Sequence, residues 1–256
     1  MSNSCVNIVI PMAGLGSRFS AAGYRAPKPL IDIFGKPMIE VVIENLMPYQ
    51  NSRFIFICQR EHYIEYELKN IFNRALGSDW ECVLLDKITE GAACTILVAE
   101  NHIDSDSDLI IANSDQIVDC DMTDYLNFAR ESNVDGLIMT FQACDAKWSY
   151  ASLNSHDEVI EVAEKKIIST HATTGIYYFS TGKTFKDAAL SMIKKNLRVG
   201  NEFYVAPVYN EIIIGGGKVR NWEIGDKAMH GIGTPEDLNA YFSFCGGYTS
   251  RSSPAG

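Results

Sequence analysis

Long apolar runs are missing from this chain of 256 residues. No segment approaches the roughly 18 consecutive apolar residues that a membrane-spanning helix needs. The first residues, Met1–Cys5, also lack the basic start and apolar core of a signal peptide. We therefore expect a cytoplasmic protein with no membrane partner.

Basic residues are scarce: 22 Lys and Arg stand against 32 Asp and Glu, for a formal net charge of −10. Non-specific nucleic-acid binding needs a basic surface, so this composition argues against a nucleic-acid partner. An anionic ligand must instead meet a local cluster of positive charge.

The cysteines lack the spacing of a metal site or a disulfide framework. There are seven, an odd number, and no Cys-x-x-Cys pair occurs. Most fall within or beside apolar runs, which predicts reduced core residues.

What the sequence does contain is a regular alternation of strand and helix patterns. The alternation predicts an α/β fold with a Rossmann-like, mainly parallel sheet flanked by helices. Shorter β-like pieces follow residue 145 and predict a small β-rich part. We expect one domain over 1–245, with a nucleotide-binding half (1–145), an acceptor-binding half (146–245) and a flexible tail (246–256). Strands are expected at 6–11, 54–58, 82–85, 109–112, 136–141, 150–153, 159–163 and 173–179, and helices at 37–46, 63–76, 92–103, 125–130 and 183–195.

The loop after the first strand is the most informative segment. Gly14 and Gly16 let the backbone approach a ligand closely, and consecutive N–H groups there can cradle phosphate oxygens. Arg18 follows, and the two prolines of Pro27–Pro29 hold Lys28 on a stiff segment. In an acidic protein, these two cations predict a triphosphate site.

Other interpretations of this loop fit less well. A dinucleotide fingerprint would place bulky Phe19 at its third small position, and a dehydrogenase would need an acidic residue near Gln59. A P-loop would need Gly-Lys-Ser/Thr where Gly16 is followed by Ser and Arg. A plain glycine turn at the end of a strand is the structural alternative.

Three segments, Ala13–Phe19, Pro27–Leu30 and Gly35–Met38, together resemble the signature of bacterial sugar-phosphate nucleotidyltransferases, some of which serve capsule or surface-polysaccharide synthesis. The resemblance implies the nucleotide-diphospho-sugar transferase fold and catalytic roles for Arg18 and Lys28. It also implies that the loop contacts the nucleotide through Met12, Ala13, Gly14, Leu15 and Gly16.

Asp115 follows an apolar strand, at the edge of an α/β sheet where ligands gather. Its carboxylate suits Mg²⁺, and the resemblance implies the same role, with an Asx turn as the structural alternative. Many relatives carry a second metal-binding aspartate where this chain has Gly231. We consider Asp226 or Glu223 as the residue that could supply the second metal ligand instead.

Two further segments are candidates for contacts to the nucleobase. Gln59 follows the second strand, and Glu90, Gly91 and Ala92 open a helix with small residues that let a flat base approach. The resemblance implies that this turn recognises the base, whereas Glu90 alone also suits a helix N-terminus.

The acceptor contacts are assigned by resemblance. Lys165 matches a lysine that meets the acceptor phosphate, although Lys166 replaces the proline that often follows. Gly175 would allow the substrate to approach a strand closely, and Glu202 would bind its hydroxyls.

Together these features predict an enzyme that uses Mg²⁺ to join an NTP to a phosphorylated small molecule, most simply a sugar phosphate. The product would be a precursor for capsule or surface polysaccharide, and relatives suggest a homo-oligomer. One alternative is a cytidylyltransferase for a non-sugar phosphate such as phosphocholine, with an aromatic cage of Trp148, Tyr150 and Trp222. Another is a nucleotide-binding protein without turnover, which the glycine at position 231 would favour.

Overall fold

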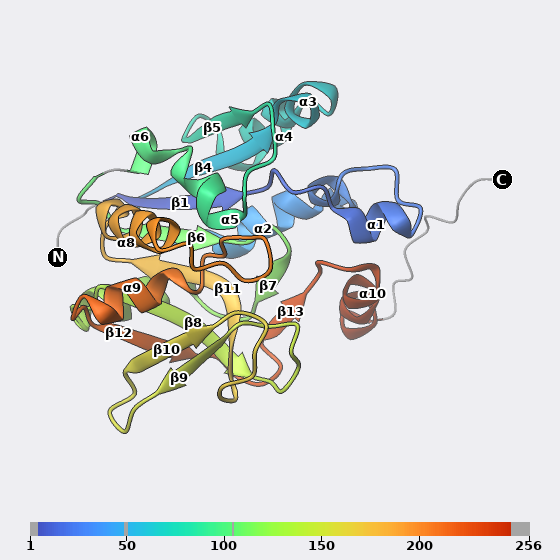
Figure 1. Ribbon diagram of the computed structural model, residues 1–256. Helices are drawn as coiled ribbons and strands as arrows, with labels where there is room; N and C mark the ends of the chain where they lie inside the picture. Colours follow the sequence, from blue (N-terminus) through green and yellow to red (C-terminus); the bar gives the residue numbers. More distant parts are fainter. Residues whose placement is uncertain (1–4, 49–50, 104, 247–256) are drawn as a thin grey trace.

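A single mixed sheet organises the part of the chain that the structure describes. The structure is a computed structural model that describes residues 5–48, 51–103 and 105–246. The nine strands of the sheet in these residues are β1 (Val6–Pro11), β4 (Ser52–Gln59), β5 (Trp80–Leu85), β6 (Leu109–Ala112), β8 (Gly136–Gln142), β9 (Tyr150–Leu153), β10 (Val159–Ala163), β11 (His171–Phe179) and β12 (Val219–Glu223). The main path runs β10-β9-β11-β6-β1-β4-β5, and β8 joins β12 to β11 (Figure 1).

The first half of the chain forms the parallel part of the sheet, β6-β1-β4-β5. In β1, Val6, Ile8 and Ile10 point into one core cluster and Val9 into the other. Alternate side chains of a strand face opposite sides, so a strand covered on both faces is apolar throughout. Parallel pairing also brings the carboxyl ends of β1, β4 and β6 to the same edge.

The second half adds antiparallel strands. β11 pairs antiparallel with both β6 and β8, and β9 and β10 form an antiparallel ribbon beside it. Opposite β8, the register of β11 shifts between Thr173 and Tyr177. Such a bulge redirects side chains, and this one contains Gly175.

Helices cover both faces of the sheet, which confirms the predicted fold class. Clusters of buried apolar side chains lie on each face, and α8 and α9 lie together over one of them (Figure 1). The first face is covered by α5 (Ala92–Leu97), α6 (Glu100–Ile103), α8 (Gly182–Lys194) and α9 (Val208–Ile214). The other is covered by α2 (Met38–Leu46), α4 (Leu68–Leu76), α7 (Met122–Glu131) and α10 (Pro235–Phe244).

Two predicted helices are each divided in the structure. The helix expected over 63–76 is instead α3 (Arg60–Glu65) and α4, because Glu67 takes a left-handed conformation with φ of 49°. The helix expected over 92–103 separates into α5 and α6.

The remaining elements are short: α1 (Ser17–Ala21), the 3₁₀ turn η1 (Lys28–Leu30), β2 (Asp32–Ile33), β3 (Lys36–Pro37), β7 (Gln116–Val118) and β13 (Met229–Gly231). Across the described ranges, no helix is both long and apolar enough to cross a membrane. The tail expected to be flexible lies, beyond residue 246, outside the described residues.

Candidate functional site

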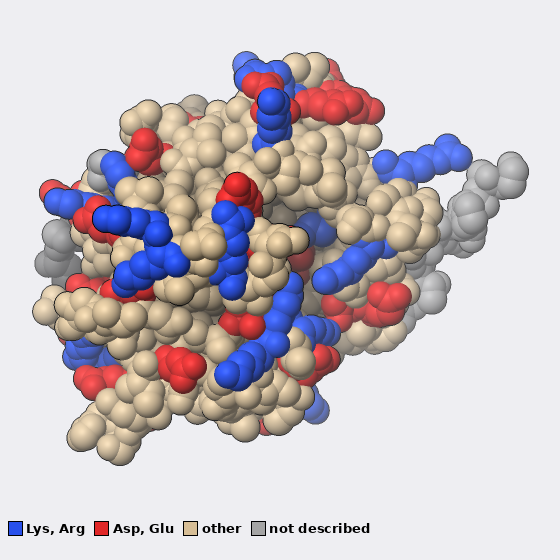
Figure 2. Space-filling model, viewed as in Figure 1, with Lys and Arg blue, Asp and Glu red and all other residues tan. Residues whose placement is uncertain are grey.

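A cavity of about 340 Å³ opens where β1, β6 and β11 meet. In the space-filling view a hollow lies near the middle of the molecule, bordered by Lys and Arg side chains (Figure 2). The lining comes from both halves of the chain and includes Pro11, Arg18, Lys28, Ala92, Asn113, Ser114, Asp115, Gln116, Lys147, Trp148, Ser149, Glu164, Thr173, Thr174, Gly175, Tyr177, Tyr204, Val205, Ala206, Met229, Gly231, Gly233 and Asp237.

The loop that follows β1 places Lys28 in this cavity. Gly16 adopts a left-handed conformation with φ of 59°, which favours glycine. A Cβ atom at Gly16 would lie 3.0 Å from the Cβ of Lys28. Gly16 therefore lets the segment that carries Lys28 pack closely against the loop. This packing places Lys28 next to the loop that is predicted to bind phosphate.

Asp115 meets Lys28 inside the cavity. The Lys28 ammonium donates a hydrogen bond of 2.9 Å to Oδ2 of Asp115, and both side chains are about one quarter exposed. The backbone oxygen of Asp115 accepts a hydrogen bond from Ile232 N, and Gly233 lies directly against its carboxylate. The C-terminal segment thus fixes the position of this acidic side chain.

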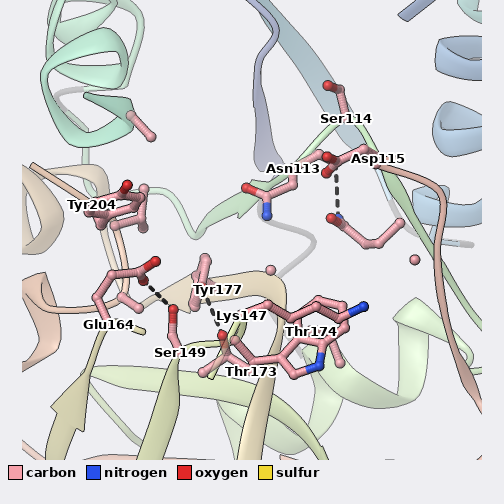
Figure 3. A pocket seen from close by; sticks show the side chains of 18 of the residues that line it. Asn113, Ser114, Asp115, Lys147, Ser149, Glu164, Thr173, Thr174, Tyr177 and Tyr204 are labelled. Atoms are coloured by element: carbon pink, nitrogen blue, oxygen red, sulfur yellow. Dashed lines mark hydrogen bonds between the residues drawn. The ribbon is translucent and has the colours of Figure 1, made fainter. Parts of the chain in front are cut away.

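The opposite wall combines one carboxyl group with aromatic and hydroxyl side chains. Figure 3 shows Glu164 and Tyr204 on this wall, across the cavity from Asn113 and Asp115. Ser149 donates a hydrogen bond to Glu164, and Thr173 and Tyr177 share another of 2.9 Å. Burial raises the pKa of Glu164, although the Ser149 hydrogen bond and the Lys165 charge lower it.

Five of the residues proposed from the sequence line the cavity: Arg18, Lys28, Ala92, Asp115 and Gly175. Arg18 has no salt-bridge partner within the described ranges, so its charge is available to a ligand. A Cβ atom at Gly175 would lie 2.4 Å from Nδ2 of Asn113. The close approach of the Asn113 side chain therefore explains why a glycine is needed at position 175. The contact of Gly175 with the acceptor stays a prediction.

The other loop residues predicted to contact the nucleotide are not among those that line the cavity. Met12 and Ala13 are buried, whereas Gly14 and Leu15 are exposed. Gln59 donates a hydrogen bond of 2.7 Å to the carbonyl oxygen of Ala13. The structure therefore gives Gln59 a role in holding the loop.

The turn at Glu90 and Gly91 joins the two halves of the protein. Glu90 forms an ion pair with Arg198 at 2.6 Å, and its carbonyl oxygen accepts a hydrogen bond of 2.8 Å from Phe203 N. A Cβ atom at Gly91 would lie 2.5 Å from the backbone of Phe203. Both residues hold the segment that carries Tyr204 against α5.

Three predicted ligand contacts lie away from the cavity lining. Lys165 donates a hydrogen bond to the Tyr204 hydroxyl and lies over its ring, with 4.5 Å between Nζ and the ring centroid. Glu202 is exposed, and so is Asp226 in the turn after β12. Asp226 is not among the residues that line the cavity, and its expected role as the second metal ligand stays a prediction. Glu223 instead accepts hydrogen bonds from Gln142 and pairs with His171.

The aromatic cage considered for phosphocholine does not form. Trp148 lines the cavity, but Tyr150 is fully buried and donates its hydroxyl to the Asp145 carbonyl oxygen at 2.8 Å. Trp222 packs against Phe128, with 4.9 Å between the ring centroids. Of the three side chains, only that of Trp148 lines the cavity.

Sequence reasoning missed Glu164, Lys147 and Asp237 as parts of the cavity. Glu164 directly precedes Lys165, so the sequence had indicated the right segment but through the neighbouring side chain. Lys147 donates a hydrogen bond of 3.0 Å to Asp237, 90 residues away in the chain. No local pattern marks such a pair.

Comparisons with known proteins agree with this arrangement. The family described as Nucleotidyl transferase matches residues 8–203. The fold defines an α/β protein with a cavity at the carboxyl edge of its parallel strands, and the chain belongs to the nucleotidyl transferase family.

Individual relatives are moderately similar. The bifunctional protein GlmU of Methanococcus aeolicus is 25% identical over 178 residues, which are 68% of this chain and 40% of that protein. The UTP–glucose-1-phosphate uridylyltransferase AglF of Haloferax volcanii is 24% identical over 184 residues, 67% of this chain and 71% of the relative. The chain therefore spans less than half the length of this GlmU.

The structure of a nucleoside-diphosphate-sugar pyrophosphorylase from Vibrio cholerae RC9 is also similar. The two chains superpose with a TM-score of 0.74 and 25% sequence identity, over 92% of this chain and 99% of the other. This likeness covers the parallel and the antiparallel parts of the sheet together.

Proposed function

We propose that this protein transfers a nucleoside monophosphate from an NTP to a phosphorylated small molecule and releases pyrophosphate. One observation carries the proposal: Arg18, Lys28 and Asp115 converge on a single cavity, although Lys28 and Asp115 are 87 residues apart. At the carboxyl edge of an α/β sheet, the two cations suit the negative charge of a triphosphate, and the carboxylate suits the cation that accompanies it.

The reaction needs no covalent intermediate on the protein. A phosphate oxygen of the acceptor attacks the α-phosphorus of the NTP, and the bond to the leaving pyrophosphate breaks. The acceptor phosphate is already ionised at neutral pH, so no serine or cysteine nucleophile has to be activated. Arg18 and Lys28 stabilise the negative charge that develops on the leaving group, and the cavity walls orient the two substrates.

The residues at the cavity suit Mg²⁺. Magnesium prefers one or two carboxylates together with substrate phosphates and water, and Asp115 offers one carboxylate at this edge. When bound there, the ion would neutralise phosphate charge. In the described ranges no group of three or more His, Cys, Asp or Glu residues could hold a metal. This fits a site in which the nucleotide supplies part of the coordination.

The acceptor side favours a polar molecule with hydroxyl groups. Glu164, Ser149 and Thr173 present hydrogen-bonding groups, and Tyr177 and Tyr204 present flat surfaces on which a sugar ring can lie. The names of AglF, a UTP–glucose-1-phosphate uridylyltransferase, and of the Vibrio nucleoside-diphosphate-sugar pyrophosphorylase both refer to sugar nucleotide chemistry. A sugar phosphate is therefore the first acceptor to test, with precursor supply for capsule or surface polysaccharide as the proposed purpose.

The experiment is a pyrophosphate-release assay with Mg²⁺ in which CTP, UTP, GTP and dTTP are each combined with sugar phosphates, polyol phosphates and phosphocholine. Release with one pair identifies both substrates. If no pair releases pyrophosphate while the NTPs still raise the melting temperature of the protein, the chain binds nucleotides without turnover and the proposal is wrong.

A further inference from the structure

The attacking phosphate requires a cation that the nucleotide does not already occupy. Among the described residues, the positive side chains that line the cavity are Arg18, Lys28 and Lys147. Arg18 and Lys28 both belong to the segment after β1, on the proposed nucleotide side. Lys147 comes from the segment that joins β8 to β9, next to Ser149 on the acceptor side.

Lys165, the lysine first expected in this role, is engaged elsewhere. Its ammonium donates to the Tyr204 hydroxyl and lies over the Tyr204 ring. Its neighbour Glu164, and not Lys165 itself, lines the cavity. Lys165 therefore contacts the Tyr204 side chain, which itself lines the cavity.

Lys147 is held in place by a short turn and by two side chains. Its backbone N–H donates a hydrogen bond of 2.9 Å to Oδ1 of Asp145. Its ammonium donates one of 3.0 Å to Asp237 and lies 4.8 Å from the centroid of the Trp148 ring. Figure 3 shows Lys147 with Thr173 and Thr174 on one wall of the cavity.

The pair with Asp237 is exchangeable. The Lys147 side chain is 47% exposed and that of Asp237 is 25% exposed, so water screens their attraction. A phosphate dianion carries more charge than a carboxylate and offers more acceptor oxygens. A phosphate oxygen can therefore accept a hydrogen bond from one N–H of the Lys147 ammonium while Asp237 accepts a hydrogen bond from another.

Gly231 lies beside the Lys147–Asp237 pair. A Cβ atom there would lie 3.5 Å from Cη2 of Trp148 and 3.8 Å from Cγ of Asp237. An aspartate at position 231 would put a second carboxylate beside Asp237, and the two carboxylates would compete for Lys147. The glycine at position 231 is thus compatible with the pairing of Lys147 and Asp237.

On the basis of the function proposed above, we infer that Lys147 binds the phosphate of the acceptor and that Asp237 positions the Lys147 ammonium for it. Lys147 is then a substrate-binding residue that sets the affinity for the acceptor. Asp237 acts through Lys147 as a positioning residue.

The test uses the full chain, Mg²⁺ and the NTP–acceptor pair that gives the greatest pyrophosphate release, with inorganic phosphate as a competitor of the acceptor. Lys147→Ala should raise the KM for the acceptor and the inhibition constant of phosphate by about tenfold to a hundredfold, as expected for the loss of a charge-assisted hydrogen bond. The KM for the NTP should change by less than about twofold, because the contact is remote from the nucleotide side. Lys147→Arg should restore part of the affinity, and Asp237→Asn should have a smaller effect of the same kind.

Two matched lysine variants complete the experiment. Lys166→Ala removes an exposed neighbouring charge and should leave both constants unchanged. If Lys165→Ala raises the acceptor KM and Lys147→Ala does not, the inference is overturned while the proposed function stands. If wild-type protein releases no pyrophosphate with any pair, the proposed function fails and this inference fails with it. Thermal melting of each variant separates lost binding from lost folding.

Discussion

Single residues at this site do two kinds of work. Lys28 and Asp115 carry charge into the cavity, whereas Gly16, Gly175 and Gly233 keep space free for their neighbours. The charged residues were predictable from local motifs. The reasons for the glycines were not, because each depends on an atom from a distant segment, such as Asn113 against Gly175.

Lys28→Ala tests the charged residues. The variant should lose about 10²–10³ in kcat, the usual cost of removing one contact to charge that develops in the transition state. The side chain is partly exposed, so the fold should persist. Steady-state kinetics and circular dichroism measure the two effects, and a folded variant with wild-type turnover would show that Lys28 has no catalytic role.

Gly233→Ala tests the spacing residues. Its Cβ would lie 2.4 Å from Oδ2 of Asp115, so the carboxylate must move. A displacement of this kind should lower kcat by about tenfold to a hundredfold. Gly225→Ala is the matched control, since a Cβ at that position has nothing within 4 Å. Equal activity of the two variants would mean that the position of Asp115 is unimportant.

Glu164 predicts a pH effect on stability. Burial raises the pKa of Glu164 in the folded state above its value in the unfolded chain. Its stabilising contribution is then complete below the unfolded pKa of about 4.3 and is lost as pH rises through the folded pKa. Glu164→Gln should therefore become more stable relative to wild type as pH rises from 4 to 8. Melting temperatures of both proteins over this range provide the measurement, and a constant or reversed difference would contradict the assignment.

At the scale of elements, the predicted strands were recovered better than the predicted helices. The apolar run of β1 is short and rich in the β-branched residues Val and Ile, and this length and composition favour a buried strand over a helix. In the sequence, the helical spacing of apolar residues over 63–76 continues past Glu67, yet in the structure the helix is interrupted at that residue. Helical periodicity alone gives no sign of a single residue with positive φ.

The contact between the α5 turn and the segment before α9 provides an element-scale prediction. Gly91 has φ of 123°, and a Cβ there would meet the Phe203 backbone at 2.5 Å. Gly91→Ala should destabilise the protein through backbone strain of about 1–3 kcal/mol, because φ of 123° with ψ of 173° is a conformation that essentially only glycine adopts. Overpacking should add a further cost of about 1–3 kcal/mol. Gly23→Ala has φ of 87° with nothing within 4 Å, so it should show the strain alone. Urea denaturation compares them, and similar losses in both variants would exclude a role for the Phe203 contact.

Across the whole molecule, an acidic chain concentrates a few cations at one cavity. The net charge of −10 made a local cluster of cations informative, and Arg18 and Lys28 do line the same cavity. The fold class was therefore accessible from sequence, and so were Arg18, Lys28 and Asp115, which line one cavity. The acceptor side was not, because Lys147, Glu164 and Asp237 meet only after the antiparallel strands and α10 fold onto the parallel sheet.

The most direct test follows the α-phosphate of the nucleotide. An NTP labelled at the α-phosphorus is incubated with the protein, Mg²⁺ and the acceptor, and the products are separated. Direct transfer predicts that the label appears in the acceptor product in a one-to-one ratio with released pyrophosphate, with none bound to the protein. Label recovered as free nucleoside monophosphate, or attached to the chain, would contradict direct transfer.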